Sequence, residues 1–591
     1  MSLLLAGCSG IPEHTPVRID GQGPPPGLGS GPDFGQQPPS RTAAHDTETF
    51  VLNFLKAAAG EPSRALEQVR EYVAPGHRHQ VREPKPVVTR HVVRLRERPQ
   101  ITRARAGADE VTLRVQQVGV LMPTGALEPP EERATEYTFT VGGVEGEKGK
   151  FVFNPPPLLL LSEDALSAFY LQRAVYFWDL EQRVLVPDLR YLPLAVPLER
   201  RRNELLQALL SGPSSWLNKV VQALPPGTKG VGNVPDNKDV LKVNLTVDAA
   251  PLGDAHQIEK LAAQLLWSLG PDTTSVLELT IEGQSTRTFR GADLRRYNPA
   301  FALPPTPERF CVYQGQVRRL TSSARQDEPV PLLTQGVNRN VVAAGLTRNG
   351  EFLAGALVVE REHRRQLIVG AGRDTGDARF RAVSGTYATM GRPVWIPGGS
   401  GFIGLVPADG KLYQFRSDSK TLTRVALPGV SGAVTAVGVA PDGHRIVLVA
   451  GGRLYVAALI HGTDVEVQPV RALPTSLRNI TGADWTSETT LVAAGVNEDG
   501  RVVLYDITVD GAIETRPPAD LGTAEVSHLV AYPAGPISGG SIGARMYVAN
   551  GIAYDFFGPG EEIRIEEIIG ATPPSGASTK SSGASAPFFL Y

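Results

Sequence analysis

A repeated segment in the second half of the chain most strongly limits the folds open to it. Five short segments, each an apolar residue followed by a turn, recur at 345–350, 395–399, 439–443, 485–488 and 531–535. Aligning positions 346, 395, 439, 485 and 531 gives steps of 49, 44, 46 and 46 residues. A four-stranded propeller blade takes about 40–50 residues. The spacing therefore predicts an all-β propeller of five or six blades over residues 301–570, a closed unit that we expect to fold alone.

The first third of the chain mixes helical and strand patterns. Apolar residues at helical spacing predict one helix around Phe50–Leu55 and a second around Leu66–Val73. Four strand-like runs follow, at 87–98, 110–121, 135–141 and 150–153. Helices followed by an antiparallel sheet predict an α+β cone of the nuclear-transport-factor-like (NTF2-like) kind over residues 42–157.

A second α+β unit is expected at residues 170–290, where strand and helix patterns alternate. It carries five short motifs in order: Tyr176-Phe177-Trp178, Leu209-Leu210-Ser211-Gly212-Pro213, Leu224-Pro225-Pro226-Gly227-Thr228, Val243-Asn244-Leu245 and Ile281-Glu282-Gly283. These motifs resemble the GerMN domain of spore-germination and sporulation proteins. The resemblance implies a non-catalytic module that binds in the cell envelope. The same residues also fit ordinary core and turn chemistry.

The first residues have the pattern of a bacterial lipobox. An apolar run, Leu3–Leu5, leads through Ala6-Gly7 to Cys8. In that scheme the Cys8 thiol is acylated and the chain is cut before it; the alternative is an ordinary N-terminal segment with one stray thiol. A signal peptide needs a basic region and ~7–15 apolar residues, but only seven residues precede Cys8 and none is basic. We therefore interpret residues 1–8 as a residual signal peptide, from a start codon placed too far downstream or a truncated chain.

Two segments have compositions that predict disorder. Residues 9–41 are rich in proline and glycine and are expected to form a mobile tether. Residues 571–591 are rich in serine, glycine and alanine and are expected to form a disordered tail, although they end in Phe588-Phe589-Leu590-Tyr591.

Composition excludes some classes of protein. No stretch of ~18 apolar residues occurs, so we expect no membrane-spanning helix. The net charge of −2 argues against nucleic-acid binding. The two cysteines are Cys8 and Cys311, and acylation of Cys8 leaves no partner for an intramolecular disulfide.

A local excess of positive charge lies at residues 64–105, with eleven Lys and Arg against four Glu. In Val93-Arg94-Leu95-Arg96 the two arginines alternate, which places them on one strand face. That face is a candidate contact for anionic phospholipid or an anionic envelope polymer. The alternative is a solvated sheet face beside the acidic residues around 128–136.

Motifs for catalysis are weak. Gly539–Gly543 matches G-x-S-x-G with Ser541 as the serine, but a nucleophile elbow runs from a strand into a helix, and the next residues read as a strand. His77 and His79 are the closest histidine pair, and no third ligand accompanies them. We therefore predict no enzyme activity, no cofactor and no metal site.

Lipobox, GerMN-like module and propeller, in this order, resemble the LpqB family of actinobacterial lipoproteins. The resemblance implies a lipid-anchored protein on the outer face of the plasma membrane. It also implies a partner, the extracytoplasmic domain of an MtrB-like sensor histidine kinase with the response regulator MtrA, and an effect on the cell wall and division. The alternatives are a propeller hydrolase, or a wall-glycan- or lipid-binding protein without a signalling role.

Overall fold

The computed structural model describes residues 37–590 except 83–87, 104–106, 133, 236–238, 251–253, 272–273, 399–400, 517–520, 538–542, 557–560 and 573–582. The chain divides into two compact units, Met1–Asp33 and Phe34–Tyr591, and every element below belongs to the second. The predicted lipobox and most of the predicted tether lie outside the described residues. None of the described helices is long and apolar enough to cross a bilayer.

The last residues of the predicted tether are ordered, which corrects its C-terminal boundary. The Tyr72 hydroxyl donates to the Pro39 carbonyl at 2.6 Å, and the Arg41 guanidinium lies 3.8 Å from the centroid of the Phe151 ring. An aromatic face that attracts a cation thus holds this segment on the first domain.

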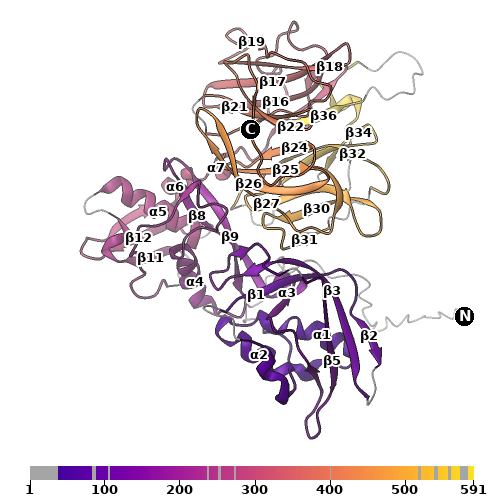
Figure 1. The fold of residues 1–591 in the computed structure, drawn as a ribbon. Helices are drawn as coiled ribbons and strands as arrows, with labels where there is room; N and C mark the ends of the chain where they lie inside the picture. The colour runs from indigo at the N-terminus through magenta and orange to yellow at the C-terminus, as the bar shows by residue number, and fades with distance from the viewer. Residues whose placement is uncertain are drawn as a thin grey trace, which may run out of the picture. The chain divides into compact units, whose positions relative to one another are not determined.

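The N-terminal domain packs helices against one face of a mostly antiparallel sheet (Figure 1). Its elements are α1 (Thr47–Phe54), α2 (Ala65–Tyr72), β1 (Arg90–Leu95), β2 (Gln100–Arg103), β3 (Asp109–Leu121), β4 (Leu127–Glu128), β5 (Glu136–Gly143), β6 (Lys150–Phe153), β7 (Leu160–Ser162) and α3 (Glu163–Phe169). The strand order is β6-β5-β3-β1-β7, with β2 and β4 also paired to β3. The Asp46 carboxylate caps α1 by accepting from Thr49 N at 2.7 Å, and Phe54 meets Phe139 of β5 edge to face.

The middle domain holds two three-stranded sheets and two long helices. Its elements are β8 (Tyr170–Asp179), β9 (Leu185–Pro193), α4 (Leu198–Leu210), β10 (Val221–Gln222), β11 (Val240–Leu245), α5 (Ala255–Leu269), β12 (Val276–Ile281), β13 (Arg287–Arg290), α6 (Gly291–Leu294) and α7 (Pro299–Ala302). The sheet orders are β10-β8-β9 and β11-β12-β13. Strand β11 alternates buried and exposed residues, the pattern of a strand covered on one face.

The C-terminal domain is a series of antiparallel sheets, as the repeat predicted. Four of them have four strands each, in the orders β20-β21-β22-β23, β24-β25-β26-β27, β28-β29-β30-β31 and β32-β33-β34-β35. The bounds are β20 (Val394–Trp395), β21 (Ile403–Ala408), β22 (Lys411–Arg416), β23 (Thr423–Arg424), β24 (Val434–Val439), β25 (Arg445–Ala450), β26 (Arg453–His461), β27 (Val465–Ala472), β28 (Arg478–Trp485), β29 (Thr490–Val496), β30 (Val502–Thr508), β31 (Glu514–Thr515), β32 (Val526–Tyr532), β33 (Ala544–Ala549), β34 (Ile552–Phe556) and β35 (Glu561–Glu562).

A seven-stranded sheet joins the two ends of this domain in the order β15-β14-β36-β16-β17-β18-β19. The bounds are β14 (Glu308–Tyr313), β15 (Gln316–Arg319), β16 (Val341–Asn349), β17 (Phe352–Arg361), β18 (Arg364–Gly372), β19 (Arg379–Ala382) and β36 (Ser585–Leu590). Strand β36 pairs antiparallel with β14 and parallel with β16 at one position, Leu346 with Leu590.

The prediction of a disordered tail is therefore wrong for residues 585–590. Phe588 is buried and stacks on Phe310 of β14 with ring centroids 5.3 Å apart. A serine- and glycine-rich composition at 573–582 concealed the apolar strand that follows it. The C-terminal domain therefore extends beyond residue 570.

Candidate binding sites and domain contacts

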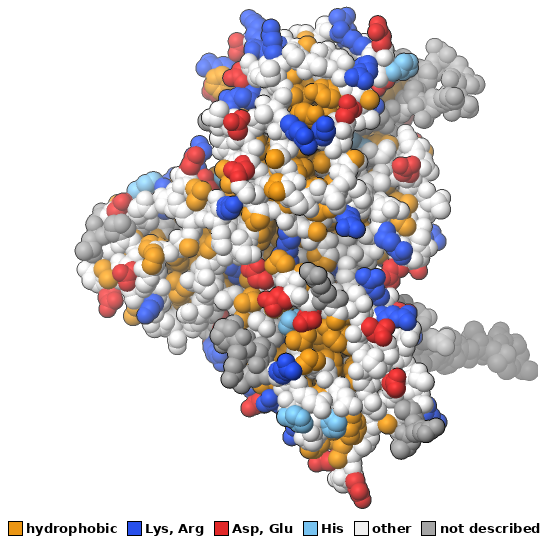
Figure 2. Space-filling model, in the orientation of Figure 1, with side chains coloured by type: hydrophobic (Ala, Val, Ile, Leu, Met, Phe, Trp, Pro, Cys, Tyr) orange, Lys and Arg blue, Asp and Glu red, His pale blue; other side chains and the backbone are white. Residues whose placement is uncertain are grey.

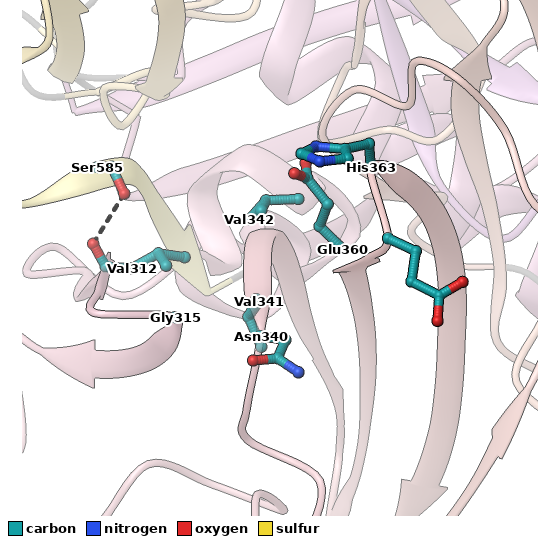
Figure 3. A pocket seen from close by; sticks show the side chains of 9 residues that line it. Val312, Gly315, Asn340, Val341, Val342, Glu360, His363 and Ser585 are labelled. Atoms are coloured by element: carbon teal, nitrogen blue, oxygen red, sulfur yellow. Dashed lines mark hydrogen bonds between the residues drawn. The ribbon is translucent and has the colours of Figure 1, made fainter.

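A hollow of about 500 Å³ lies where the two ends of the C-terminal domain meet, and we call it the seam hollow (Figure 3). Strands β16 and β36 pair at one position only, so their N-terminal ends leave a gap. Val312 and Ser585 lie on one side of it, and Glu360 near the end of β17 and His363 of the β17–β18 turn lie on the other. The hollow therefore depends on β36, the strand that the sequence composition did not predict.

The charges around the seam hollow are mixed. Glu360 accepts from Arg365 at 3.1 Å, whereas Glu362 and His363 are exposed at the turn. Basic side chains gather over the end of the domain that carries β18 and β19 (Figure 2). A rim of this kind suits a polar, charged protein surface better than an apolar small molecule.

A second hollow, of about 320 Å³, lies in the middle domain between β8, β10 and α5. The Leu224–Pro226 loop, part of one GerMN-like motif, forms one wall. Glutamine side chains and Lys260 form another. We call this the amide hollow.

Glu488 joins the middle and C-terminal domains in a buried contact. Its carboxylate accepts from the Tyr176 hydroxyl at 2.7 Å and from Asn298 Nδ2 at 2.8 Å. Burial raises the pKa of Glu488, and burial together with this carboxylate raises the pKa of Tyr176 well above its usual value. Two hydrogen bonds from a neutral hydroxyl and an amide satisfy the buried carboxyl, which fixes the relation of the two domains at this point.

Arg94 forms a corresponding contact from the N-terminal domain. Its guanidinium lies 2.5 Å from Glu163 and 3.2 Å from Glu514 of β31. Burial lowers its pKa, but the two carboxylates outweigh burial, so the net shift is upward. The prediction of a basic strand face is therefore wrong at Arg94, because α3 and the C-terminal domain cover it, while Arg96 remains exposed.

A pair of stacked histidines completes the contact between the middle and C-terminal domains. His444 Nε2 lies 3.4 Å from Asp179 Oδ2, and the rings of His444 and His461 stack with centroids 4.8 Å apart. Burial, and then the neighbouring His444, lower the pKa of His461 to about 4. The neutral form of His461 is therefore the one that fits this contact.

The other sequence-predicted residues carry no assembled chemistry in the described part of the chain. Cys8 and Ser541 lie outside it, and a strand, β33, follows Ser541 where an elbow requires a helix. His77 lies in a short 3-10 helix and bonds to Gln80 at 3.2 Å. Cys311 is buried in β14, and burial raises its pKa to about 12, so its thiol is unreactive. No group of three metal-ligating side chains occurs among the described residues.

Sequence reasoning missed Glu488, and the repeat held no signal for it. The equivalent positions of the five aligned turns are Asn349, Gly398, Asp442, Glu488 and Ala534, so an acidic residue there is not unusual. The buried partners of Glu488, Tyr176 and Asn298, lie in the middle domain, far away along the chain. The amide hollow gave no signal either, because its side chains come from separate elements.

Two packed α+β domains followed by a ring-like series of four-stranded sheets define a multidomain, mostly β protein. A family model described as the Lipoprotein LpqB beta-propeller domain matches residues 315–536, and one described as Sporulation and spore germination matches residues 174–287. The chain belongs to the LpqB lipoprotein family, and its middle and C-terminal domains are a GerMN domain and a β-propeller.

Relatives match over most of the chain. Lipoprotein LpqB of Corynebacterium jeikeium is 27% identical, covering 86% of this chain and 85% of the relative. Lipoprotein LpqB of Nocardia farcinica is 24% identical, covering 90% and 89%. Among solved structures, TolB from Acinetobacter baumannii covers 57% of this chain and 97% of its own with a TM-score of 0.30 and 11% identity.

Proposed function

We propose that the protein is anchored to the outer face of the plasma membrane through an acylated Cys8. The relatives are named lipoproteins over most of the chain, and Leu5-Ala6-Gly7-Cys8 has the pattern that acylation requires. Stable anchoring needs more than one acyl chain or a second membrane contact. The proline- and glycine-rich residues after Cys8 supply a tether between the bilayer and the folded domains.

The anchoring proposal is tested by fractionating cells that express the chain behind a complete signal peptide. Cys8→Ala is expected to move the protein from the membrane fraction to the medium, whereas Ser9→Ala leaves it in the membrane. Equal retention of both variants after a salt wash would rule out the lipid anchor.

We propose that the anchored protein acts by binding, without catalysis, to the extracytoplasmic domain of an MtrB-like sensor kinase. One observation supports a binding surface on the propeller. The contacts of Glu488, Glu514 and His444 with the other two domains involve the sheets β24–β27 and β28–β31 and the turns that follow their strands. The seam hollow belongs to the seven-stranded sheet and stays accessible to a partner.

At a finer level, we infer six blades and an NTF2-like N-terminal cone. Strands β16–β19 supply one blade, and β36, β14 and β15 supply the last. Ile568 bridges to Leu320 beside β15, so it fills the fourth strand position of that blade. The C-terminal segment thus contributes both the inner and the outer part of the closing blade.

The binding proposal is tested with the full chain and the kinase extracytoplasmic domain by surface plasmon resonance. Glu362→Lys reverses an exposed charge at the seam hollow and is expected to weaken binding at least about tenfold. Glu466→Lys reverses an exposed charge on β27 and is the matched control, with affinity within about twofold of the parent chain. Equal affinities of both variants would show that the kinase binds a surface other than the seam hollow. If neither the parent chain nor either variant binds the kinase domain, the proposal is rejected.

A further inference from the structure

The amide hollow plays no part in the proposed function, yet it has the features of a ligand site. Its volume of about 320 Å³ falls within the ~300–1,000 Å³ typical of small-molecule sites. It lies between the β8–β9 turn, β10, α5 and the Leu224–Pro226 loop. The loop that helps to define the GerMN resemblance therefore forms the wall of a hollow.

One side of the hollow is a set of amide groups held in fixed orientations. Gln182 Oε1 accepts from Gln257 Nε2 at 3.1 Å and from Lys260 Nζ at 3.0 Å. Gln182 Nε2 donates to Gln222 Oε1 at 3.0 Å, and Gln222 Nε2 donates to the Leu180 carbonyl at 2.7 Å. These bonds order the amide groups before a ligand arrives, which lowers the entropy cost of binding.

Gln264 lines the hollow and is 3% exposed. Its Nε2 donates to the Tyr176 carbonyl at 2.9 Å, which orients the amide and leaves its oxygen for a ligand N–H. Leu261, Ala249 and Ala250 line the hollow with small apolar surfaces. An amide acceptor beside an apolar wall is the environment that an acetamido group requires, with an N–H to donate and a methyl group to bury.

Charge and shape further limit the class of ligand that the hollow can bind. No Asp or Glu lines the hollow in the part of the chain that the structure describes, so it offers no carboxylate to a cation. The positive charge of Lys260 is compatible with a carboxylate on the ligand. The exposed rings of Pro225 and Pro226 suit the C–H face of a pyranose ring. The Trp178 indole is buried, with Lys260 over its ring and Tyr297 packed against it. The indole N–H is already used, donating to the Lys260 carbonyl at 3.0 Å.

We propose that the amide hollow binds an N-acetylated sugar unit of an extracellular glycan. The inference goes beyond kinase binding and does not depend on it. Both halves of the recognition, the amide and the methyl contact, are specific to the acetamido group. A sugar with hydroxyl in place of acetamido leaves the Gln264 oxygen without a donor and the apolar wall uncovered.

The test is isothermal titration of the full chain with two tetrasaccharides that differ in this group. Chitotetraose, an N-acetylglucosamine tetramer, is expected to bind at least about tenfold more tightly than cellotetraose, the glucose tetramer. Saturation-transfer NMR is expected to show the strongest transfer at the acetyl methyl protons. Equal affinities for the two sugars, or binding of neither, would overturn the proposal, as would tighter binding of the peptide N-acetyl-alanyl-alanine.

Variants locate the site. Gln264→Leu and Gln182→Ala are each expected to weaken chitotetraose binding about tenfold or more, whereas Gln207→Ala, on the exposed face of α4, leaves it within about twofold. Gln182 is partly exposed and makes no buried bond, so its variant remains informative if Gln264→Leu fails to fold. Unchanged affinity of Gln182→Ala would place any sugar site elsewhere. Kinase binding measured without sugar separates this proposal from the previous one.

Discussion

Arg94 is a charged residue buried in the contact between the N-terminal domain and the propeller, where it forms ion pairs with Glu163 and Glu514. We expect Arg94→Met to lower the free energy of unfolding by about 3–5 kcal/mol, because it leaves two buried carboxylates without a cation. Chemical denaturation followed by tryptophan fluorescence measures the loss. Arg96→Met, at the exposed residue that directly follows β1, is the control and is expected to cost less than about 0.5 kcal/mol. Equal costs for the two variants would show that the buried ion pairs contribute nothing.

Gly443 is the turn residue of a repeat segment and has φ +75°. A Cβ at this position would lie 2.3 Å from the Pro397 carbonyl oxygen, whereas a Cβ at Gly500, also at φ +75°, meets nothing within 4 Å. Both alanine variants are expected to cost about 1–2 kcal/mol for the left-handed backbone. Gly443→Ala is expected to cost about 1–3 kcal/mol more for the close contact. Thermal melts of the two proteins measure the difference, and identical melting temperatures would contradict it.

Sequence could predict side-chain alternation but not what covers each face. The pattern Val93-Arg94-Leu95-Arg96 predicts both arginines on one strand face, yet β1 ends at Leu95, Arg94 is buried and Arg96 is exposed. The difference comes from Glu163 of α3 and from Glu514, which lies more than four hundred residues away along the chain. Local pattern carries no information about such a contact, and the same holds for Tyr176 and Glu488.

Strand β36 is the element that closes the propeller, and its loss is expected to be severe. A chain ending at Gly570 would leave β14 paired with β15 alone and expose Phe310, which is buried against Phe588. We therefore withdraw the expectation that residues 301–570 fold alone. Such a truncated chain is expected to aggregate without a cooperative melt, measured by circular dichroism.

A single substitution tests the same element without truncation. Phe588→Ala is expected to cost about 3–5 kcal/mol of unfolding free energy, the usual range for a buried phenylalanine. Phe352→Ala, at a 45% exposed ring beside Arg373, is the control and is expected to cost about 1 kcal/mol or less. If the truncated chain melts cooperatively and Phe588→Ala is neutral, β36 is dispensable.

The pair formed by His444, in the turn before β25, and His461, at the end of β26, predicts a pH dependence of stability. The pKa of His461 is lowered from 6.5 to about 4 in the folded protein, so the unfolded chain binds more protons between these values. Stability is therefore expected to fall as the pH drops from about 6.5 towards 4, by about 1.4 kcal/mol for each unit of pKa difference. The partly buried His528, whose pKa is also lowered to about 4 by burial, acts in the same direction.

Melting temperatures of the parent chain and of His461→Gln between pH 7.5 and 4.5 check this dependence. The variant cannot gain a proton at this position, so its melting temperature is expected to fall less on acidification. Asp179, Asp442 and Arg183 also face the pair, and their charges stay in place in the variant. If the melting temperatures of the two proteins fall equally with pH, His461 does not cause the pH dependence.

At the level of elements, periodicity predicted the type of structure better than its ends. The repeat at about 46 residues gave the propeller because every blade repeats one apolar strand and one turn. The closing strand, β36, was not predicted because it follows a serine-rich stretch and lies far along the chain from its partners β14 and β16. The two hollows were not predicted for a related reason, since each is lined by segments that meet only in the folded chain.

Across the whole second unit, the three domains share one buried apolar cluster that extends from Phe50 to Ile513. Glu488, Arg94 and His444 add polar contacts at its edges. Such packing makes the domains a joint surface held near the bilayer by the proposed anchor. Confinement to one membrane raises the effective concentration towards a membrane-bound partner without any new contact.

The most direct test of a tethered binding protein is its association with the sensor kinase in one bilayer, measured by fluorescence energy transfer between labelled proteins in liposomes. The acylated chain is expected to associate at protein densities where the Cys8→Ser chain, added from solution, shows no transfer. Absence of transfer from the acylated chain, together with a hydrolytic activity that Ser541→Ala abolishes, would contradict the account and favour an enzyme.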